Sequence, residues 1–267
     1  MKKLNLWHLI ITVFILSWTG ILPSLLRAYE IPIPKGLENL EILMTIGPLL
    51  GAVIYIFKMN GKQGLKAFFS RLLGFKAPLG VLLVTFLLPF LISFVGSWMG
   101  LSLSESAWPD SFTPITIMTN GLVIFLMYLV LNTEELVWRG LVFDQFLDKY
   151  GYFKSCLLLI PIWWLFHIPL FLFPEGHPAG YGLGIFTCIV IAQTFILGWI
   201  YVKSNRSLFY VHMHHQLING FGQAFPIFPV FVSGNMLPVW VFSLLLLLTA
   251  GFLIFQMRGI PKSQKKN

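Results

Sequence analysis

Long apolar stretches separated by short polar loops follow one another along the whole chain. Eight of them are long enough for an α-helix to cross a bilayer, which takes about 20 residues. They cover residues 6–26, 40–57, 77–101, 114–147, 153–173, 182–202, 207–227 and 236–257. The first stretch is too long for the core of a signal peptide and has no clear small-residue cleavage site, so we expect an uncleaved first span. The pattern predicts an all-α, polytopic membrane protein with eight transmembrane helices.

The polar segment between the second and third spans has a helical pattern of its own. Apolar residues repeat there at helical spacing with basic residues between them, which is typical of an amphipathic helix that lies on a membrane surface. The apolar positions are Leu65, Phe68, Phe69, Leu72 and Leu73, and the basic positions are Lys62, Lys66 and Arg71. We therefore expect one amphipathic surface helix between Lys58 and Lys76.

Composition supports this class of protein. The chain is 57% hydrophobic and only 10% charged, whereas soluble domains usually carry about 25% charged residues. We therefore expect one integral-membrane domain over residues 1–267 rather than a series of soluble modules. Cys156 and Cys188 both lie in apolar spans without paired spacing, so they are interpreted as small hydrophobic residues rather than a disulfide or a metal pair.

The net charge of +8 is explained by orientation rather than by nucleic-acid binding, because the cations lie in short loops between spans. If the N-terminus is inside, every Lys and Arg falls on the inner side except Arg27 and Lys35. That asymmetry is the one that the positive-inside rule requires, and the inner cations would meet anionic lipid head groups. We expect a multi-pass protein of the cell membrane with both termini cytoplasmic and no nucleic-acid partner.

Three ionisable residues lie within six positions inside the apolar stretch 114–147, namely Glu134, Glu135 and Arg139. Each such side chain at the bilayer centre costs about 2.5–3.5 kcal/mol on insertion scales, so each needs a use or a partner. Glu135 and Arg139 are four residues apart, on one helical face, and are able to pair. Glu134 points elsewhere. It is either a protonated glutamate beside a structural ion pair or a general base.

Further polar side chains fall at the same depth. A rise of 1.5 Å per residue places Glu134, His167 and Asn219 about 20 Å from the cytoplasmic boundary, with His215 one turn shallower. Each of them alone could simply bond a neighbouring helix. Together they supply a carboxylate base, two imidazoles and an amide, which are the groups needed to activate water and stabilise an oxyanion. His212 shares the helical face of His215 and Asn219 and is a weaker candidate.

The order and spacing of three motifs resemble the signature of the CPBP intramembrane proteases, the type II CAAX prenyl endopeptidase or Abi family. The motifs are Glu134-Glu135-x-x-x-Arg139, an aromatic residue four positions before His167, and His215-x-x-x-Asn219. The motif-bearing core covers about residues 120–222. One position departs from the family, because the second motif usually begins with Phe and here begins with Trp163. We expect that change to alter the shape of the pocket and to leave the chemistry intact.

The resemblance implies an intramembrane endopeptidase whose cavity opens toward the cytoplasm and the bilayer. By matching position, the catalytic residues would be Glu134, His167, His215 and Asn219, supported by Glu135 and Arg139. The first two would activate the attacking water and the next two would hold the oxyanion. The substrate would be a membrane-associated peptide, either a prenylated C-terminal tail or a leader-type peptide.

A zinc-dependent form of the same protease is the alternative, because one glutamate and two histidines can form a zinc site with water as the fourth ligand. The chain has no His-Glu-x-x-His helix, and a metal-bound Glu134 would leave no base except Glu135, which Arg139 occupies. We therefore favour a glutamate mechanism without a metal cofactor.

Two non-proteolytic functions compete with this hypothesis. A transporter or proton relay would need polar residues through the full depth of the membrane, and the outer halves of the spans are almost free of charge. A bacteriocin-immunity protein that acts by binding would tolerate Glu134→Gln, whereas a protease would not.

Overall fold

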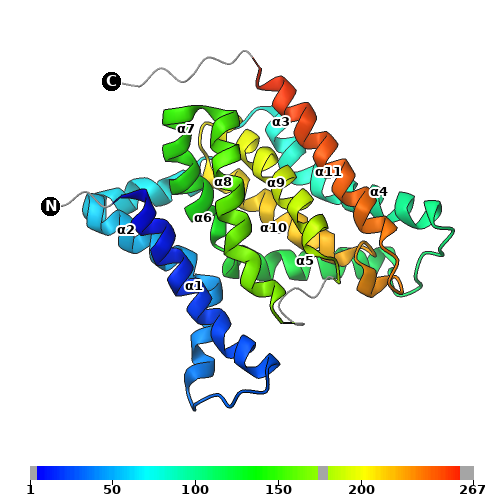
Figure 1. Cartoon of the computed structure of the whole chain (residues 1–267). Helices are drawn as coiled ribbons and strands as arrows, with labels where there is room; N and C mark the ends of the chain where they lie inside the picture. The colour runs from blue at the N-terminus through cyan, green and yellow to red at the C-terminus, as the bar shows by residue number, and fades with distance from the viewer. Residues whose placement is uncertain (1–4, 174–179, 259–267) are drawn as a thin grey trace.

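A computed structural model describes residues 5–173 and 180–258 of the chain, and all of its regular elements in these ranges are helical (Figure 1). The predicted all-α class is confirmed. The longer helices are α1 (Leu6–Ala28), α2 (Ile42–Phe69), α4 (Leu88–Leu103), α5 (Pro114–Leu131), α8 (Tyr152–His167), α9 (Leu183–Lys203), α10 (Leu208–Ala224) and α11 (Leu237–Gln256). The short helices are α3 (Leu79–Leu82), α6 (Glu134–Val137) and α7 (Asp144–Tyr150).

Seven helical segments of the described chain are long and apolar enough to cross a membrane. They correspond to the expected spans with one exception, the span predicted at residues 207–227. That segment is α10, which has 17 residues and carries three histidines and two glutamines, so it is shorter and more polar than the others. Because α10 packs against α4, α5 and α9, it is an interior helix, and the count of eight crossings stays a prediction.

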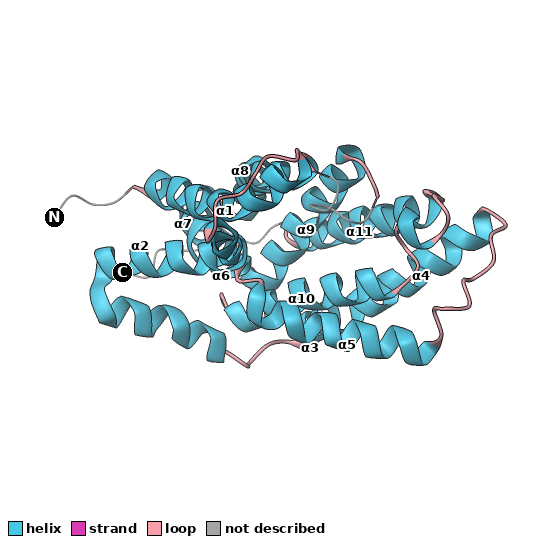
Figure 2. Cartoon of the chain, turned by 90° about the horizontal axis from the view of Figure 1, so that it is seen from below, coloured by secondary structure: helices cyan, strands magenta, loops and turns pink. Residues whose placement is uncertain are grey.

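The predicted amphipathic helix is present. The backbone of α2 breaks at Gly61, whose φ of 61° and ψ of −156° lie in a region that glycine alone adopts readily. Figure 2 shows the last part of α2 turning back beneath its first part. In this last part Phe68 is buried whereas Lys62 and Lys66 are exposed, as expected for a helix with one apolar and one basic face.

The single helix expected over residues 114–147 is wrong. The chain leaves α5 after Leu131 and begins α6 at Glu134, because Asn132 has an extended backbone with φ −92° and ψ 100°. The side-chain oxygen of Asn132 accepts a hydrogen bond from the backbone N–H of Glu134 at 3.2 Å. Such local bonds from Asn compete with a continuous helix. Figure 1 shows α5 running across the view and α6 and α7 running upward from its end.

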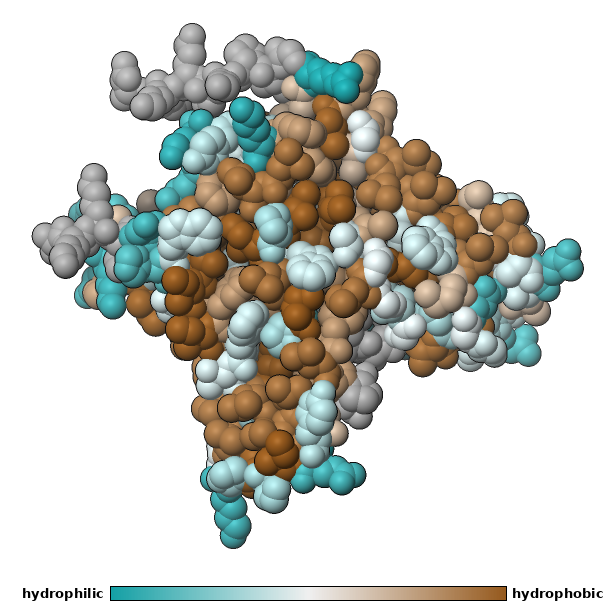
Figure 3. All heavy atoms as spheres, in the orientation of Figure 1, coloured by the Kyte–Doolittle hydropathy of each residue, from teal (hydrophilic) through white to brown (hydrophobic). Residues whose placement is uncertain are grey.

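The surface agrees with a multi-pass membrane protein. Hydrophobic residues cover most of the middle of the face in Figure 3, and hydrophilic residues gather toward its margins. Large apolar side chains such as Trp98, Ile115 and Leu248 are exposed on the helices. A soluble monomer rarely exposes such large continuous apolar areas, so these faces are suited to lipid. The helix α9 is the most enclosed of the candidate spans.

Candidate active site

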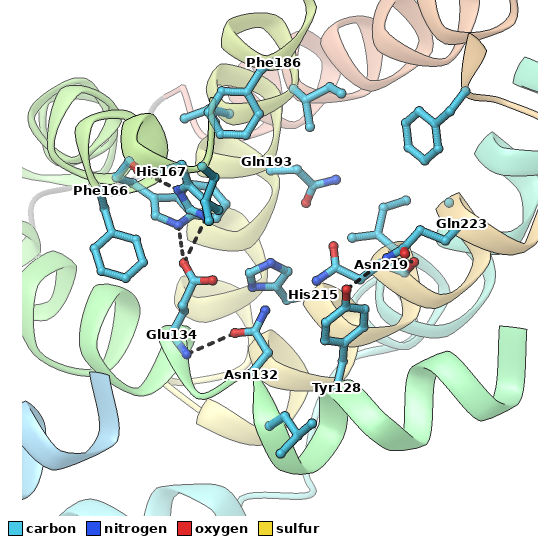
Figure 4. A pocket seen from close by; sticks show the side chains of 18 of the residues that line it. Tyr128, Asn132, Glu134, Phe166, His167, Phe186, Gln193, His215, Asn219 and Gln223 are labelled. Atoms are coloured by element: carbon cyan, nitrogen blue, oxygen red, sulfur yellow. Dashed lines mark hydrogen bonds and ion pairs between the residues drawn. The ribbon is translucent and has the colours of Figure 1, made fainter. Parts of the chain in front are cut away.

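A cavity of about 710 Å³ opens within the helical bundle. Its lining includes the four residues predicted to be catalytic, which are Glu134, His167, His215 and Asn219. They come from α6, α8 and α10, and Figure 4 shows their side chains around one hollow. The helices therefore bring together side chains that lie up to 85 positions apart in the sequence.

Glu134 is the first residue of α6, and its side chain is only 14% exposed. The carboxylate oxygen Oε2 accepts hydrogen bonds from two indole N–H groups, that of Trp163 at 2.8 Å and that of Trp138 at 3.1 Å. The Nε2 atom of His167 lies 3.5 Å from the same oxygen. The other oxygen, Oε1, takes part in none of these contacts, so it is the one left for a water or a substrate.

His167 ends α8 and is oriented by its own helix. Its Nδ1 atom lies 2.9 Å from the carbonyl oxygen of Trp163, one turn earlier. A carbonyl only accepts hydrogen bonds, so Nδ1 carries the proton in this contact and Nε2 is the ring nitrogen turned toward Glu134. The α-helix gives way here to the 3-10 turn Ile168–Phe171, because Pro169 has no N–H to donate to a carbonyl one turn earlier.

Glu135 is fully buried and serves a different set of partners. Its Oε1 accepts a hydrogen bond from Nη1 of Arg139 at 2.7 Å, which confirms the predicted pair. The same oxygen accepts a second hydrogen bond from Nδ1 of His215 at 2.8 Å, a contact that the sequence did not predict. Since Nδ1 of His215 is the donor to Glu135, Nε2 is the ring nitrogen available to the cavity.

Asn219 lies one helical turn after His215 on α10 and also lines the cavity. The carbonyl oxygen of Asn219 accepts a hydrogen bond from the side chain of Gln223 at 3.2 Å, and Gln223 also donates to the hydroxyl of Tyr128 at 3.3 Å. Through Gln223 these bonds tie the end of α10 to α5, so the backbone that carries the Asn219 side chain is held in place.

Residues 114–221 match the family model of the Rce1-like type II CAAX prenyl endopeptidases. A curated relative, CAAX prenyl protease 2 of Methanococcus maripaludis, is 29% identical over 230 residues, which cover 81% of this chain and 82% of the relative. The resemblance carried by the three motifs is thereby confirmed, and the match supports a membrane-bound protease.

The matched region, residues 114–221, includes the break between α5 and α6. The break leaves backbone carbonyls without helical partners, and side chains of α10 donate hydrogen bonds to them. The carbonyl oxygen of Leu129 accepts from Nε2 of His212 at 2.9 Å, and that of Asn132 accepts from the side chain of Gln216 at 3.1 Å. His212 therefore holds the end of α5. The expectation that it lines the catalytic face with Asn219 is wrong, because its ring is turned to the α5 backbone.

Another histidine of the matched region also holds two segments of the fold together. His214 is fully buried, and its Nδ1 atom lies 2.9 Å from the carbonyl oxygen of Val84. Val84 lies in the π-helical turn Leu83–Leu87. In such a turn the backbone hydrogen bonds span five residues instead of four. His214 thus anchors α10 to this turn.

The zinc alternative requires three ligand side chains to lie close together around the cavity. Within residues 5–173 and 180–258, no group of three or more His, Cys, Asp or Glu side chains is placed to hold a metal ion. The described side chains give the zinc alternative no support, and the choice of a mechanism without metal stays a prediction.

Sequence reasoning missed the two tryptophans that hold Glu134. Trp138 follows Glu134 by four residues, so helical spacing alone could have placed them on one face. Trp163 was predicted to change only the shape of the pocket. Its indole N–H in fact bonds the carboxylate from a different helix, and no local pattern reveals such a contact.

Proposed function

We propose that the protein is an intramembrane endopeptidase in which Glu134 is the general base. The observation that carries the proposal is the meeting of Glu134, His167, His215 and Asn219 in one cavity. A carboxylate with one oxygen held and the other left open is suited to take a proton from water. The match of residues 114–221 to a family of endopeptidases supports the reaction class.

In the proposed reaction the water oxygen attacks the carbonyl carbon of the scissile peptide bond while one water proton passes to Oε1 of Glu134. The carbonyl π electrons move onto its oxygen and form the oxyanion. When this intermediate collapses, the C–N bond breaks and the proton held by Glu134 passes to the leaving nitrogen. The products are a carboxylic acid and an amine, so atoms and charge balance. His167, whose Nε2 lies 3.5 Å from Glu134, orients the base and stabilises its charge when Nε2 as well as Nδ1 carries a proton.

The oxyanion would be held by His215 and Asn219. Both side chains line the cavity, and donors aimed at a developing negative charge are among the strongest contributions to catalysis. Glu135 accepts from Nδ1 of His215, so it can balance the charge of an imidazolium whose Nε2–H donates to the oxyanion. Arg139 holds Glu135 in place. The supporting pair thus acts through His215.

The substrate we propose is a membrane-associated peptide with a prenylated C-terminal tail. The relative's name refers to prenyl protease activity, and most of the side chains around the cavity are apolar, such as Met127, Phe166 and Ile218. An apolar wall accommodates a hydrocarbon chain, and the few polar groups orient the peptide. Cleavage of a matched leader-type peptide without a prenyl group at the same rate would favour the other predicted class.

The first prediction concerns Glu134→Gln, which keeps the size of the side chain and removes its basicity. In proteoliposomes with a prenylated peptide, we expect the cleavage rate to fall by at least about a hundredfold, because general bases contribute on the order of 10²–10⁴-fold. The measurement is product formation by mass spectrometry. Cleavage by this variant at the wild-type rate would contradict the proposal and favour a protein that acts by binding.

The matched control is Glu38→Gln, since Glu38 is an exposed glutamate on the segment Leu37–Glu41, outside the cavity lining. It should cleave at the wild-type rate. A tight chelator should leave the wild-type rate unchanged as well. Activity that disappears with the chelator and returns with zinc would overturn the mechanism without metal.

A further inference from the structure

Trp163 lies at the centre of the charged groups of the site. It is 4% exposed, and its Nε1–H donates to Oε2 of Glu134 at 2.8 Å. The guanidinium of Arg139 stacks over its ring, with the central carbon 4.2 Å from the ring centroid. The rings of His167 and His215 meet it edge-on at 5.8 and 5.6 Å. One side chain therefore contacts the base, its histidine partner and the support of the oxyanion site.

Neighbouring groups restrict the indole of Trp163. Arg139 is fully buried and held by Glu135, and its guanidinium lies over the indole face in a cation–π contact. The backbone of Trp163 is engaged too, because its carbonyl accepts from Nδ1 of His167 at 2.9 Å. Trp163 therefore orients Glu134 by its side chain and His167 by its backbone.

The direction of the hydrogen bond determines its effect. An indole N–H only donates, so it favours the ionised carboxylate over the protonated acid. Trp138 donates to the same oxygen at 3.1 Å, which is a longer contact. The other charged and titratable groups that face Glu134 are His167 on α8, His215 on α10, and Glu135 and Arg139 on its own segment. Changing an indole leaves all of them present.

We propose that Trp163 is a positioning residue that occupies Oε2 of Glu134 and leaves Oε1 to take the proton from water. This inference rests on the proposed role of Glu134 as base. Neither the comparisons nor the spacing of the motifs assigns such a role to this position.

The test is Trp163→Phe, which retains an aromatic ring and the backbone carbonyl and removes the N–H. We expect the acidic limb of the kcat/KM–pH profile for peptide cleavage to move up by about one pH unit, because a hydrogen bond to the charged form is lost. The variant should therefore fall roughly tenfold below wild type at the acidic end and approach it at high pH.

The matched control is Trp164→Phe, the same substitution one residue later on α8. The N–H of Trp164 donates to the hydroxyl of Thr187 at 2.9 Å, and the side chain does not line the cavity. Its pH profile should superimpose on that of wild type. A loss of packing alone would lower the rate at every pH, whereas loss of the donor changes the shape of the profile.

Two outcomes would overturn the inference. One is an acidic limb for Trp163→Phe that coincides with that of Trp164→Phe while both variants are folded by circular dichroism. If Trp163→Phe fails to fold, Trp138→Phe removes the other indole donor and should move the acidic limb in the same direction by less. An acidic limb of Trp138→Phe that coincides with that of wild type is the second outcome. Full activity of Glu134→Gln would instead refute the role of the base itself, so the two failures are distinguishable.

Discussion

At the residue scale, the two adjacent glutamates have separate partners. Consecutive residues on a helix point about 100° apart, so Glu134 faces α8 whereas Glu135 faces α10 and Arg139. The first carboxylate keeps one oxygen open to the cavity, and the second is buried completely. Adjacent residues of the same type therefore differ in their surroundings enough for the two proposed roles, base and support.

The buried pair allows a prediction about stability. Arg139→Met should lower the free energy of unfolding by about 3–5 kcal/mol, because it leaves the carboxylate of Glu135 without its cation. The measurement is denaturant-induced unfolding in mild detergent. The control is Arg27→Met, which breaks the exposed pair with Glu41 and should cost at most about 1 kcal/mol. Equal losses in the two variants would contradict the assignment of a structural role to the buried pair.

At the element scale, the site depends on an interrupted helix. The break between α5 and α6 turns the chain so that Glu134 begins a new helix, and it leaves backbone carbonyls without helical partners. Inside a membrane such groups must be satisfied by the protein itself. His212 and Gln216 of α10 do so. The helix that carries His215 and Asn219 thus also stabilises the turn that positions the base.

The break can be tested through Gln216, which is fully buried. Gln216→Leu removes the donor to the carbonyl of Asn132 and should destabilise the protein by about 1–3 kcal/mol. Thermal unfolding in detergent measures the effect, and cleavage activity should fall with it because Glu134 loses its fixed position. Gln145→Leu on the exposed side of α7 is the control and should change neither. An unaltered melting temperature for Gln216→Leu would refute the supporting role.

The π-helical turn Trp138–Phe143 links the site to the amphipathic segment. The carbonyl of Gly140 in this turn accepts a hydrogen bond from Arg71 at 3.0 Å, and Arg71 also contacts the hydroxyl of Tyr201. Arg71 lies in the 3-10 turn Ser70–Leu73, which follows α2 and ends the amphipathic segment. This segment is therefore attached to the segment that carries the glutamates.

At the scale of the whole molecule, charge is concentrated in loops at the ends of helices. In the loop between α9 and α10, Arg206 pairs with Asp144 at 2.8 Å and with Asp148 at 2.5 Å. The hydrogen bond to Asp148 raises the pKa of the Arg206 guanidinium further above its ordinary value. Arg206 therefore stays charged throughout the neutral range, and it adds no pH dependence to cleavage.

The orientation of the molecule in the membrane stays a prediction, and single cysteines can test it. After Cys156 and Cys188 are replaced by serine, Glu105→Cys should react with a membrane-impermeant maleimide in intact cells. Lys62→Cys should react only after permeabilisation, because the surface helix is predicted to be cytoplasmic. Both positions are exposed. The reverse labelling pattern would contradict the predicted cytoplasmic termini.

The sequence by itself determined the all-α class, the apolar spans apart from α10 and the residues after Leu131 in the stretch 114–147, the amphipathic helix and the pair Glu135–Arg139. All of these follow from the spacing of residues along one helix, which is local information. The motif residues could also be identified, because chemistry limits which residue types can activate water.

Only the tertiary structure decided which side chains of different helices meet. The break after Leu131, the contact of His215 with Glu135, and the hydrogen bond from Trp163 to Glu134 all depend on how α6, α8 and α10 pack. The helical period gives the direction of a side chain from its own axis, but it says nothing about the distance or angle to a neighbouring axis. For that physical reason the sequence predicted only a change of pocket shape at Trp163, whereas the structure shows that its indole donates a hydrogen bond to Glu134.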